Sequence, residues 1–282
     1  PEGASDTEVV GRFLREARAA VRLRSEHVAK VLDVGTLDTG SPYIVMEYLE
    51  GRDLQAVLSE RGKLPAHTAV SYVLQACEAI AEAHAHHIVH RDLKPANLFL
   101  TRRNDGTPCI KVLDFGISKL GTDGLNAGLT KTSRLMGTPY YISPEQLRSS
   151  KSADARSDIW ALGMILYELL TGSVAFPRDT LPELCTAIIY EPVPELSGVG
   201  VAPQLVSVVM RCLEKAPESR FQTLAELASA LSSFVVNGDA SAERISRILD
   251  PESRTGSIQP PPEPKLGAPT MVSASDPPPP SR

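Results

Sequence analysis

The 282-residue sequence lacks any run of about 18 consecutive apolar residues, the minimum length of a helix that crosses a membrane. It also lacks the basic start and the short apolar stretch of a signal peptide. We therefore expect no membrane segment in this chain and a cytoplasmic location.

An excess of basic residues is also missing. The sequence has 29 lysines and arginines against 34 aspartates and glutamates, which gives a net charge of −5, and it contains no local basic patch. Binding to nucleic-acid phosphates needs such a patch, so we expect no nucleic-acid partner. The four cysteines have no Cys-x-x-Cys spacing, which indicates reduced thiols rather than a metal site or a disulfide framework.

Aromatic residues make up only 5% of the sequence, and the end of the chain has none. Ten of the 23 prolines lie instead in the last 32 residues. A segment of this composition cannot bury enough apolar surface to form a core. We predict a proline-rich, disordered linker or tail over residues 237–282.

Ahead of this tail the pattern is mostly helical. Apolar residues recur at helical spacing over residues 10–21 and 70–81, whereas residues 28–35 and 43–47 have the pattern of strands. Residues 159–170 are apolar almost all round, which is typical of a helix at the centre of a domain. The chain is long enough for one large domain or two small ones. We predict an α+β fold.

Two motifs carry the chemistry. The run His90-Arg91-Asp92-Leu93-Lys94-Pro95-Ala96-Asn97 is followed about twenty residues later by Asp114-Phe115-Gly116. Phosphoryl transfer requires a carboxylate that orients the attacking hydroxyl, oxygen ligands for Mg²⁺ and a cation near the moving phosphate. Asp92 is the right residue type for the first task and Lys94 for the third. Asn97 and Asp114 are the right types for the metal.

These motifs resemble the catalytic domain of the eukaryotic-like serine/threonine protein kinases, and most closely its bacterial members. The resemblance extends from about Val9 to Phe234. It implies a two-lobed, protein-kinase-like fold with a truncated N-lobe, made of the first helix plus two strands, and a mainly helical C-lobe. The partial N-lobe and hinge would take residues 1–49 and the C-lobe residues 50–236.

The resemblance also assigns roles to residues. It implies ATP and Mg²⁺ as cofactors, with Asp92 as the base, Lys94 as a contact of the γ-phosphate, and Asn97 and Asp114 as the two metal ligands. The substrates would be proteins with serine or threonine hydroxyls. The histidines from His84 to His90 are interpreted as the end of a helix and not as a zinc site, because zinc ligands must converge.

An ATP-binding hinge is expected after the second strand. By resemblance, Met46 would be the gatekeeper, Glu47 and Leu49 would lie in the segment that meets adenine, and Phe99 would lie under the ring. Their apolar character alone does not distinguish Met46 and Phe99 from ordinary core residues.

Several further residues are expected to be structural. The segment Gly137 to Glu145 matches the end of the family's activation segment, with Ser143 in place of the usual alanine before Pro-Glu. Its Gly-Thr start favours serine and threonine substrates over tyrosine. The resemblance implies that Glu145 forms a buried ion pair with Arg220.

Two other contacts are implied around the 90–97 run. Asp158 would accept hydrogen bonds from the backbone of this run and so fix Asp92. His90 would pack against Phe115. Each of these residues also has a plain interpretation when taken alone, such as a helix cap or a solvated charge.

Regulation by phosphorylation is also implied. In the family, the residue at Arg91 binds a phosphate on the activation loop. Thr130 and Thr132 are the expected sites of autophosphorylation, with Ser133 as third choice, and a kinase dimer would be the partner in that reaction. The alternative is that these hydroxyls only solvate a loop.

Two parts of the family pattern are missing from the sequence: the glycine-rich loop and the strand lysine. Glu16 stands where the family's lysine-binding glutamate belongs. We therefore expect an N-truncated kinase that is inactive or weakly active in isolation. Whether the parent protein has a membrane anchor beyond the linker is left open. The alternatives are a pseudokinase-like scaffold, which the intact Asp92, Asn97 and Asp114 disfavour, and a small-molecule kinase, which lacks an activation segment of this type.

Overall fold

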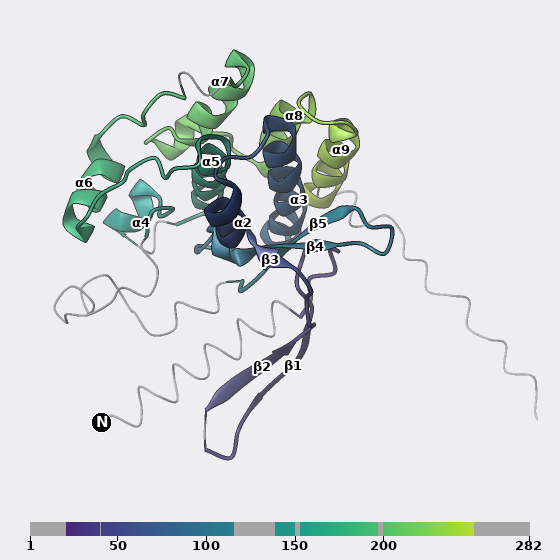
Figure 1. Cartoon of the computed structure of the whole chain (residues 1–282). Coiled ribbons are helices and arrows are strands. Elements are labelled where there is room, and N and C mark those ends of the chain that lie inside the picture. Colours follow the sequence, from purple (N-terminus) through teal and green to yellow (C-terminus); the bar gives the residue numbers. More distant parts are fainter. Residues whose placement is uncertain (1–20, 40, 116–138, 150–152, 197–199, 251–282) are drawn as a thin grey trace, which may run out of the picture.

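The computed structural model describes residues 21–39, 41–115, 139–149, 153–196 and 200–250. Its strands and helices are β1 (Val31–Thr36), β2 (Pro42–Met46), β3 (Arg52–Asp53), α2 (Leu54–Arg61), α3 (Ala66–Ala85), β4 (Leu98–Arg102), β5 (Pro108–Val112), α4 (Pro144–Arg148), α5 (Ala155–Thr171), α6 (Leu181–Tyr190), α7 (Pro203–Cys212), α8 (Leu224–Ser232) and α9 (Gly238–Leu249). Helices dominate these residues, and two small sheets accompany them (Figure 1). The predicted α+β class is confirmed.

The strands form a two-stranded and a three-stranded antiparallel sheet. The hairpin β1–β2 projects from the helical body, and the second sheet, of order β3-β4-β5, contacts α3 through β5 (Figure 1). Backbone bonds join the segment before β1 to β5: Ala29 N donates to Val112 O (3.0 Å) and Val112 N donates to His27 O (2.7 Å). Of the five strands found in the described residues, only β1 and β2 were predicted from the pattern.

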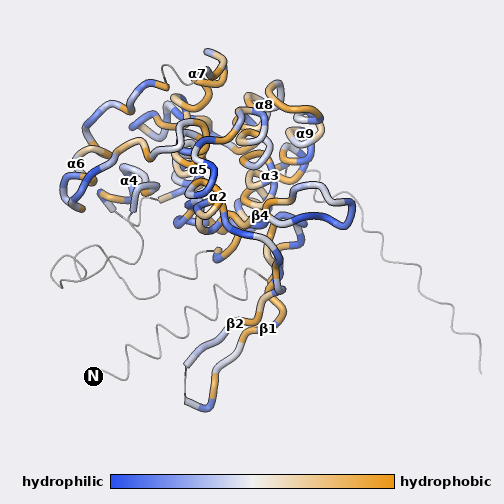
Figure 2. The backbone as a smooth tube through the Cα atoms, viewed as in Figure 1, coloured by the Kyte–Doolittle hydropathy of each residue, from blue (hydrophilic) through white to orange (hydrophobic). Residues whose placement is uncertain are grey.

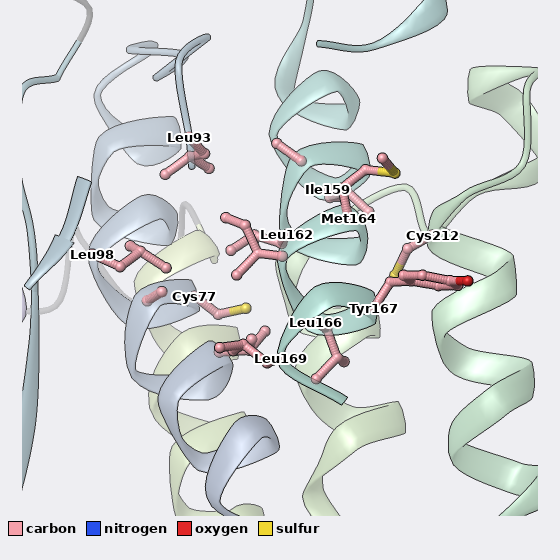
Figure 3. Close-up of a cluster of buried hydrophobic side chains, with 14 of the residues drawn as sticks. Cys77, Leu93, Leu98, Ile159, Leu162, Met164, Leu166, Tyr167, Leu169 and Cys212 are labelled. Atoms are coloured by element: carbon pink, nitrogen blue, oxygen red, sulfur yellow. The ribbon is translucent and has the colours of Figure 1, made fainter. Parts of the chain in front are cut away.

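Helix α5 lies at the centre of the helical body, as predicted for residues 159–170. It begins at the cap Asp154, whose side chain accepts a hydrogen bond from Arg156 N (2.8 Å), and ends at Gly172, which has a left-handed φ of 79°. Residues 157–170 are all buried. Side chains of α3, β4, α5 and the 90–97 segment meet in one apolar cluster (Figure 3).

Helix α7 approaches α5 closely at a glycine. A Cβ atom added to Gly163 would lie only 2.5 Å from the Cβ of Cys212 on α7, which is far inside van der Waals contact. Because Gly163 has no side chain, the two helices pack backbone against side chain at this point. Gly163 is therefore a packing requirement of the core.

The predicted tail boundary at residue 237 is wrong. Residues 238–249 form α9, which packs on α3 and α8. Ile245 is fully buried, and Arg244 donates to the Glu78 carboxylate on α3 at 2.7 and 3.1 Å. The apolar residues of α9 recur at helical spacing, but the prolines that suggested a tail begin only at Pro251. Residues 251–282 lie outside the described part of the chain.

Parts of the hairpin β1–β2 are apolar, as the orange stretches of its backbone tube show (Figure 2). Leu32 is 63% exposed and Val45 is 43% exposed.

In the described part of the chain, no helix combines the length and the apolar character needed to span a bilayer.

Candidate active site

The segment His90–Asn97, here called the 90–97 loop, connects α3 to β4 through the short 3₁₀ turn Pro95–Asn97. The first residue of the loop, His90, is fully buried. Its Nε2 donates to Leu113 O (2.9 Å), and its Nδ1 accepts a hydrogen bond from Asp92 N (3.3 Å). Burial lowers the pKa of His90, which favours the neutral ring that this pattern of one donor and one acceptor requires. The ring centroids of His90 and Phe115 are 5.0 Å apart, so the predicted contact is present.

Asp158, on the first turn of α5, holds the same loop from the other side. Its Oδ2 accepts from His90 N (2.9 Å) and its Oδ1 accepts from Arg91 N (2.9 Å), as expected from the sequence. Burial by itself would raise the pKa of Asp158, but the hydrogen bonds and the charges around it hold that pKa below its ordinary value. The carboxylate therefore stays ionised in the core.

One partner of Asp158 was missed from the sequence. His84 Nε2 on α3 lies 2.7 Å from Asp158 Oδ2, and both side chains are buried. The histidine run was interpreted only as the end of a helix. No local pattern identifies this contact, because its two residues come from helices that meet only in the folded chain.

Three of the predicted catalytic residues lie together at the end of the loop. Lys94 Nζ donates to Asp92 Oδ2 (2.9 Å), and Asn97 Nδ2 donates to Asp92 O (2.8 Å), with a longer contact to Asp92 Oδ2 (3.4 Å). The side chains of Asp92 and Lys94 are about three-tenths exposed, at 27% and 30%. A carboxylate that water can reach, beside a lysine, is suited to accept a proton from an incoming hydroxyl group.

Asp114 is brought to this cluster through the backbone. Leu113 N donates to Asn97 O (2.9 Å), and Leu113 O accepts from His90 Nε2 (2.9 Å), so both polar groups of Leu113 bind the 90–97 loop. The next residue, Asp114, has a φ of +54°, a conformation that is uncommon for a residue other than glycine, and is exposed. The bonds of Leu113 thus place Asp114 next to the loop that carries Asp92 and Asn97.

Asn97 and Asp114 fit the requirements of Mg²⁺. The amide nitrogen of Asn97 is occupied by Asp92, which leaves the amide oxygen for a cation. Amide and carboxylate oxygens are hard ligands, the type that Mg²⁺ prefers.

The expected hinge contains an ion pair that the sequence did not indicate. Glu47 Oε1 accepts from Lys111 Nζ on β5 (2.8 Å) and from Lys30 N (2.8 Å). Burial opposes ionisation of Glu47, but the Lys111 bond and the Lys30 bond hold its pKa below the ordinary value. The hinge is therefore tied to β5, the strand that leads to Asp114.

The other residues predicted for ATP binding lie in this hinge or on β4. Met46 ends β2 and begins the expected hinge, Leu49 ends the hinge, and Phe99 lies on β4; all three are partly buried. The Cε1 atom of Phe99 would lie 3.1 Å from a Cβ atom added at Gly51, so this ring packs against the turn that follows the hinge. Their contact with adenine remains a prediction.

The predicted ion pair between Glu145 and Arg220 is present and buried. Arg220 Nη1 and Nη2 each donate to one Glu145 oxygen at 2.8 Å, and Ser157 Oγ donates to Oε1 at 2.7 Å. Burial by itself would raise the pKa of Glu145, but Arg220 and Ser157 lower it to about 2. This pair fixes α4, which carries Glu145, to the region after α7.

Some predicted residues lie outside the described part of the chain. These are Glu16, Thr130, Thr132 and Ser133, together with Gly116 and Gly137 of the two motifs. Arg91, the expected phosphate-binding residue, is described, and its backbone has a φ of +67°.

The comparisons with known proteins cover most of the chain. A family model described as a protein kinase domain matches residues 2–231. The serine/threonine-protein kinase PknB of Mycolicibacterium smegmatis is 36% identical over 273 residues, which are 95% of this chain and 42% of that protein. PknB of Mycobacterium leprae is 38% identical over 233 residues, which are 81% of this chain and 36% of that protein. Pkn3 of Myxococcus xanthus is 39% identical over 222 residues, which are 77% of this chain and 40% of that protein.

This chain therefore spans between 36% and 42% of the length of these three relatives. The matched region contains the 90–97 loop, Asp114, Glu145 and Arg220, whose contacts were described above. On this evidence the chain belongs to the protein kinase domain family, with bacterial serine/threonine-protein kinases among its relatives.

Proposed function

We propose that the protein is a serine/threonine kinase that transfers the γ-phosphoryl group of ATP to serine or threonine hydroxyls of proteins. The observation that carries this proposal is the cluster of Asp92, Lys94 and Asn97, to which the Leu113 backbone joins Asp114. These are the groups that phosphoryl transfer requires. The names of the relatives, all serine/threonine-protein kinases, support the substrate class.

In the proposed reaction the bond between the γ-phosphorus and the oxygen that bridges it to the β-phosphate breaks. A bond forms between the γ-phosphorus and the hydroxyl oxygen, and ADP leaves. Asp92 orients the hydroxyl and accepts its proton, while Lys94 supplies positive charge beside the transferred group. Asn97 and Asp114 would hold Mg²⁺, which neutralises charge on the phosphates when it is bound.

Activation by autophosphorylation is part of this proposal. Thr130 and Thr132 would be the acceptors and two kinase molecules the reacting pair, with Arg91 as the phosphate-binding residue. The need for ATP and the absence of a cysteine pattern typical of secreted proteins favour a cytoplasmic location. Phosphopeptide mass spectrometry of an active preparation should find at least one of the two threonines modified.

The test uses the full-length protein and radiolabelled ATP. Asp92→Asn should lower the rate of phosphoryl transfer about 10²–10⁴-fold, the usual contribution of a general base. Asp105→Asn is the matched control. Asp105 lies in the turn between β4 and β5, and its exposed carboxylate accepts hydrogen bonds from Thr107. The control should keep the wild-type rate.

ATP binding in the presence of Mg²⁺ separates this proposal from the scaffold alternative. Asp114→Asn should weaken Mg²⁺-dependent ATP binding, since it removes one ligand charge. If the wild-type protein binds ATP but transfers no phosphate to itself or to a serine/threonine peptide library, the kinase proposal fails and a binding module replaces it. Transfer that persists in Asp92→Asn would contradict the assigned base.

A further inference from the structure

Arg91, the residue before Asp92, is held in a strained backbone conformation from both sides. Its φ is +67°, the left-handed region that residues other than glycine rarely occupy. Its N–H donates to Asp158 Oδ1 (2.9 Å), and its C=O accepts from Gln146 Nε2 (3.1 Å). A conformation of this kind persists only where the surrounding structure fixes it. A turn of the Arg91 backbone toward a common conformation would redirect the chain at Asp92.

The contact with Gln146 comes from helix α4 and is specific in its orientation. Gln146 Oε1 accepts two hydrogen bonds from Ser143, one from its backbone N (3.1 Å) and one from its Oγ (3.0 Å). Because the oxygen of the amide faces two donors, the NH₂ group must face the other way, toward Arg91 O. Ser143 is fully buried and Gln146 is 6% exposed, so water does not compete for these bonds.

Helix α4 itself is anchored in the core. Ser143 and Gln146 form a capping box at its first turn, and the neighbouring Glu145 is bound by Arg220. Gln146 therefore lies on a rigid helix. A side chain held in this way can fix its partner, here the Arg91 carbonyl, within a fraction of an ångström. The hydroxyl group of Ser143, at a position where the family usually has alanine, is one of the two donors that orient the amide; the other is the Ser143 backbone N–H.

We propose that Gln146, oriented by Ser143, is a positioning residue for phosphoryl transfer: it holds the Arg91 carbonyl and thereby keeps Asp92 in the geometry of a base. This inference rests on the proposed kinase function and adds a residue to it. Through Gln146, helix α4 has a direct contact with the 90–97 loop. Neither Asp158 nor His90 provides this contact, because both bind the loop at other atoms.

The decisive variant in the full-length protein is Gln146→Glu. It keeps the acceptor for Ser143 but replaces the NH₂ donor with a carboxylate oxygen, which faces the Arg91 carbonyl without a proton to share. We expect kcat to fall at least 10-fold per folded molecule while KM for ATP changes less than threefold, because the base is displaced and the ATP contacts are not. The folded fraction is measured by circular dichroism at the assay temperature.

Gln222→Glu is the matched control. Gln222 Nε2 also donates to backbone carbonyls, those of Pro217, Glu218 and Arg220, but it has no contact with the 90–97 loop. The same chemical change should leave kcat of the folded fraction unchanged. A merely structural role of Gln146 would give this result for Gln146→Glu as well, and that outcome would overturn the proposal.

A second comparison is available if Gln146→Glu does not fold. Ser143→Ala removes one of the two donors that orient the amide and should lower kcat about threefold, but it should have no effect on kcat in a Gln146→Met background. An equal effect in both backgrounds would show that Ser143 does not act through Gln146. Wild-type kcat in Ser143→Ala and Gln146→Met, with Asp92→Asn inactive, would refute this inference alone. Full activity of Asp92→Asn would instead refute the assignment of Asp92 as the base, and this inference with it, whereas the proposed function itself fails only if the wild-type protein transfers no phosphate.

Discussion

Removal of Arg220 should destabilise the protein strongly, because it leaves the Glu145 carboxylate buried without a cation. The Arg220 side chain has 0% exposure and Glu145 has 10%. Arg220 makes two bonds to Glu145 and three more to the backbone oxygens of Arg156, Glu214 and Lys215. Arg220→Met keeps most of the side-chain volume over the Trp160 ring, so the change is mainly one of charge and hydrogen bonds.

The magnitude follows from the burial of the pair. Stranding one member of a buried ion pair costs about 3–5 kcal/mol, and the loss of donors to three carbonyls favours the upper half of this range. Glu145→Gln should cost less, about 2–3 kcal/mol, because the amide oxygen still accepts one bond and Arg220 keeps its three carbonyl partners. In the double variant the two costs should overlap by about 2 kcal/mol, since neither charge is then left without its counterpart.

Urea denaturation at pH 7, monitored by circular dichroism, gives the free energies of unfolding for the four proteins of this cycle. The pH dependence is a second readout. In the wild type the pKa of Glu145 is lowered from 4.5 to about 2, so its stabilisation is complete above pH 4.5 and is lost as the pH falls through about 2. In Arg220→Met burial should raise that pKa, so the deficit relative to wild type should shrink as the pH falls below 5. Additive single effects, within about 0.5 kcal/mol, would refute the reasoning.

Three further predictions concern other contacts. Asp158→Asn should lower kcat more than 10-fold in the kinase assay, because one amide cannot accept from both His90 N and Arg91 N as two carboxylate oxygens do, whereas Asp154→Asn, which keeps a helix cap, should not. Gly163→Ala should cost about 1–3 kcal/mol in urea denaturation, and the additional change Cys212→Gly should recover part of it; an unchanged midpoint would contradict the close approach of α5 and α7. Ile245→Ala should cost about 2–5 kcal/mol, whereas a disordered tail at this position would give no change.

The sequence predicted the parts of the site that lie close together along the chain. The 90–97 loop and Asp114 are recognisable because each role needs one residue type at a fixed spacing, and α5 because its apolar residues cover the whole helix surface. By contrast, strands β4 and β5 are short, and each is stabilised mainly by its backbone hydrogen bonds to the other strand. The residues within each strand alone therefore predict it poorly. Helix α9 was assigned to the tail because it directly precedes the proline-rich segment that begins at Pro251, although it packs on α3 and α8.

The residues that sequence reasoning missed share a physical property. His84, Lys111 and Gln146 are polar, and each acts on a partner more than 50 positions away, at separations of 74, 64 and 55 residues. Periodicity records which residues are buried but not which polar atoms meet in the interior. A buried polar side chain has to be paired, so its position alone predicts a partner, yet only the tertiary structure identifies that partner.

The 90–97 loop shows why such contacts matter for the chemistry. Its apolar anchors are few, with Leu93 the main one, and a loop has no internal ladder of hydrogen bonds to keep its shape. Its geometry is instead set by groups on three other elements: Asp158 on α5, Gln146 on α4 and the Leu113 backbone after β5. Since these elements are packed against the core, a displacement of any one of them reaches Asp92 through one or two hydrogen bonds. Loss of activity in this protein should therefore follow from substitutions well outside the loop, at sites where the fold remains intact.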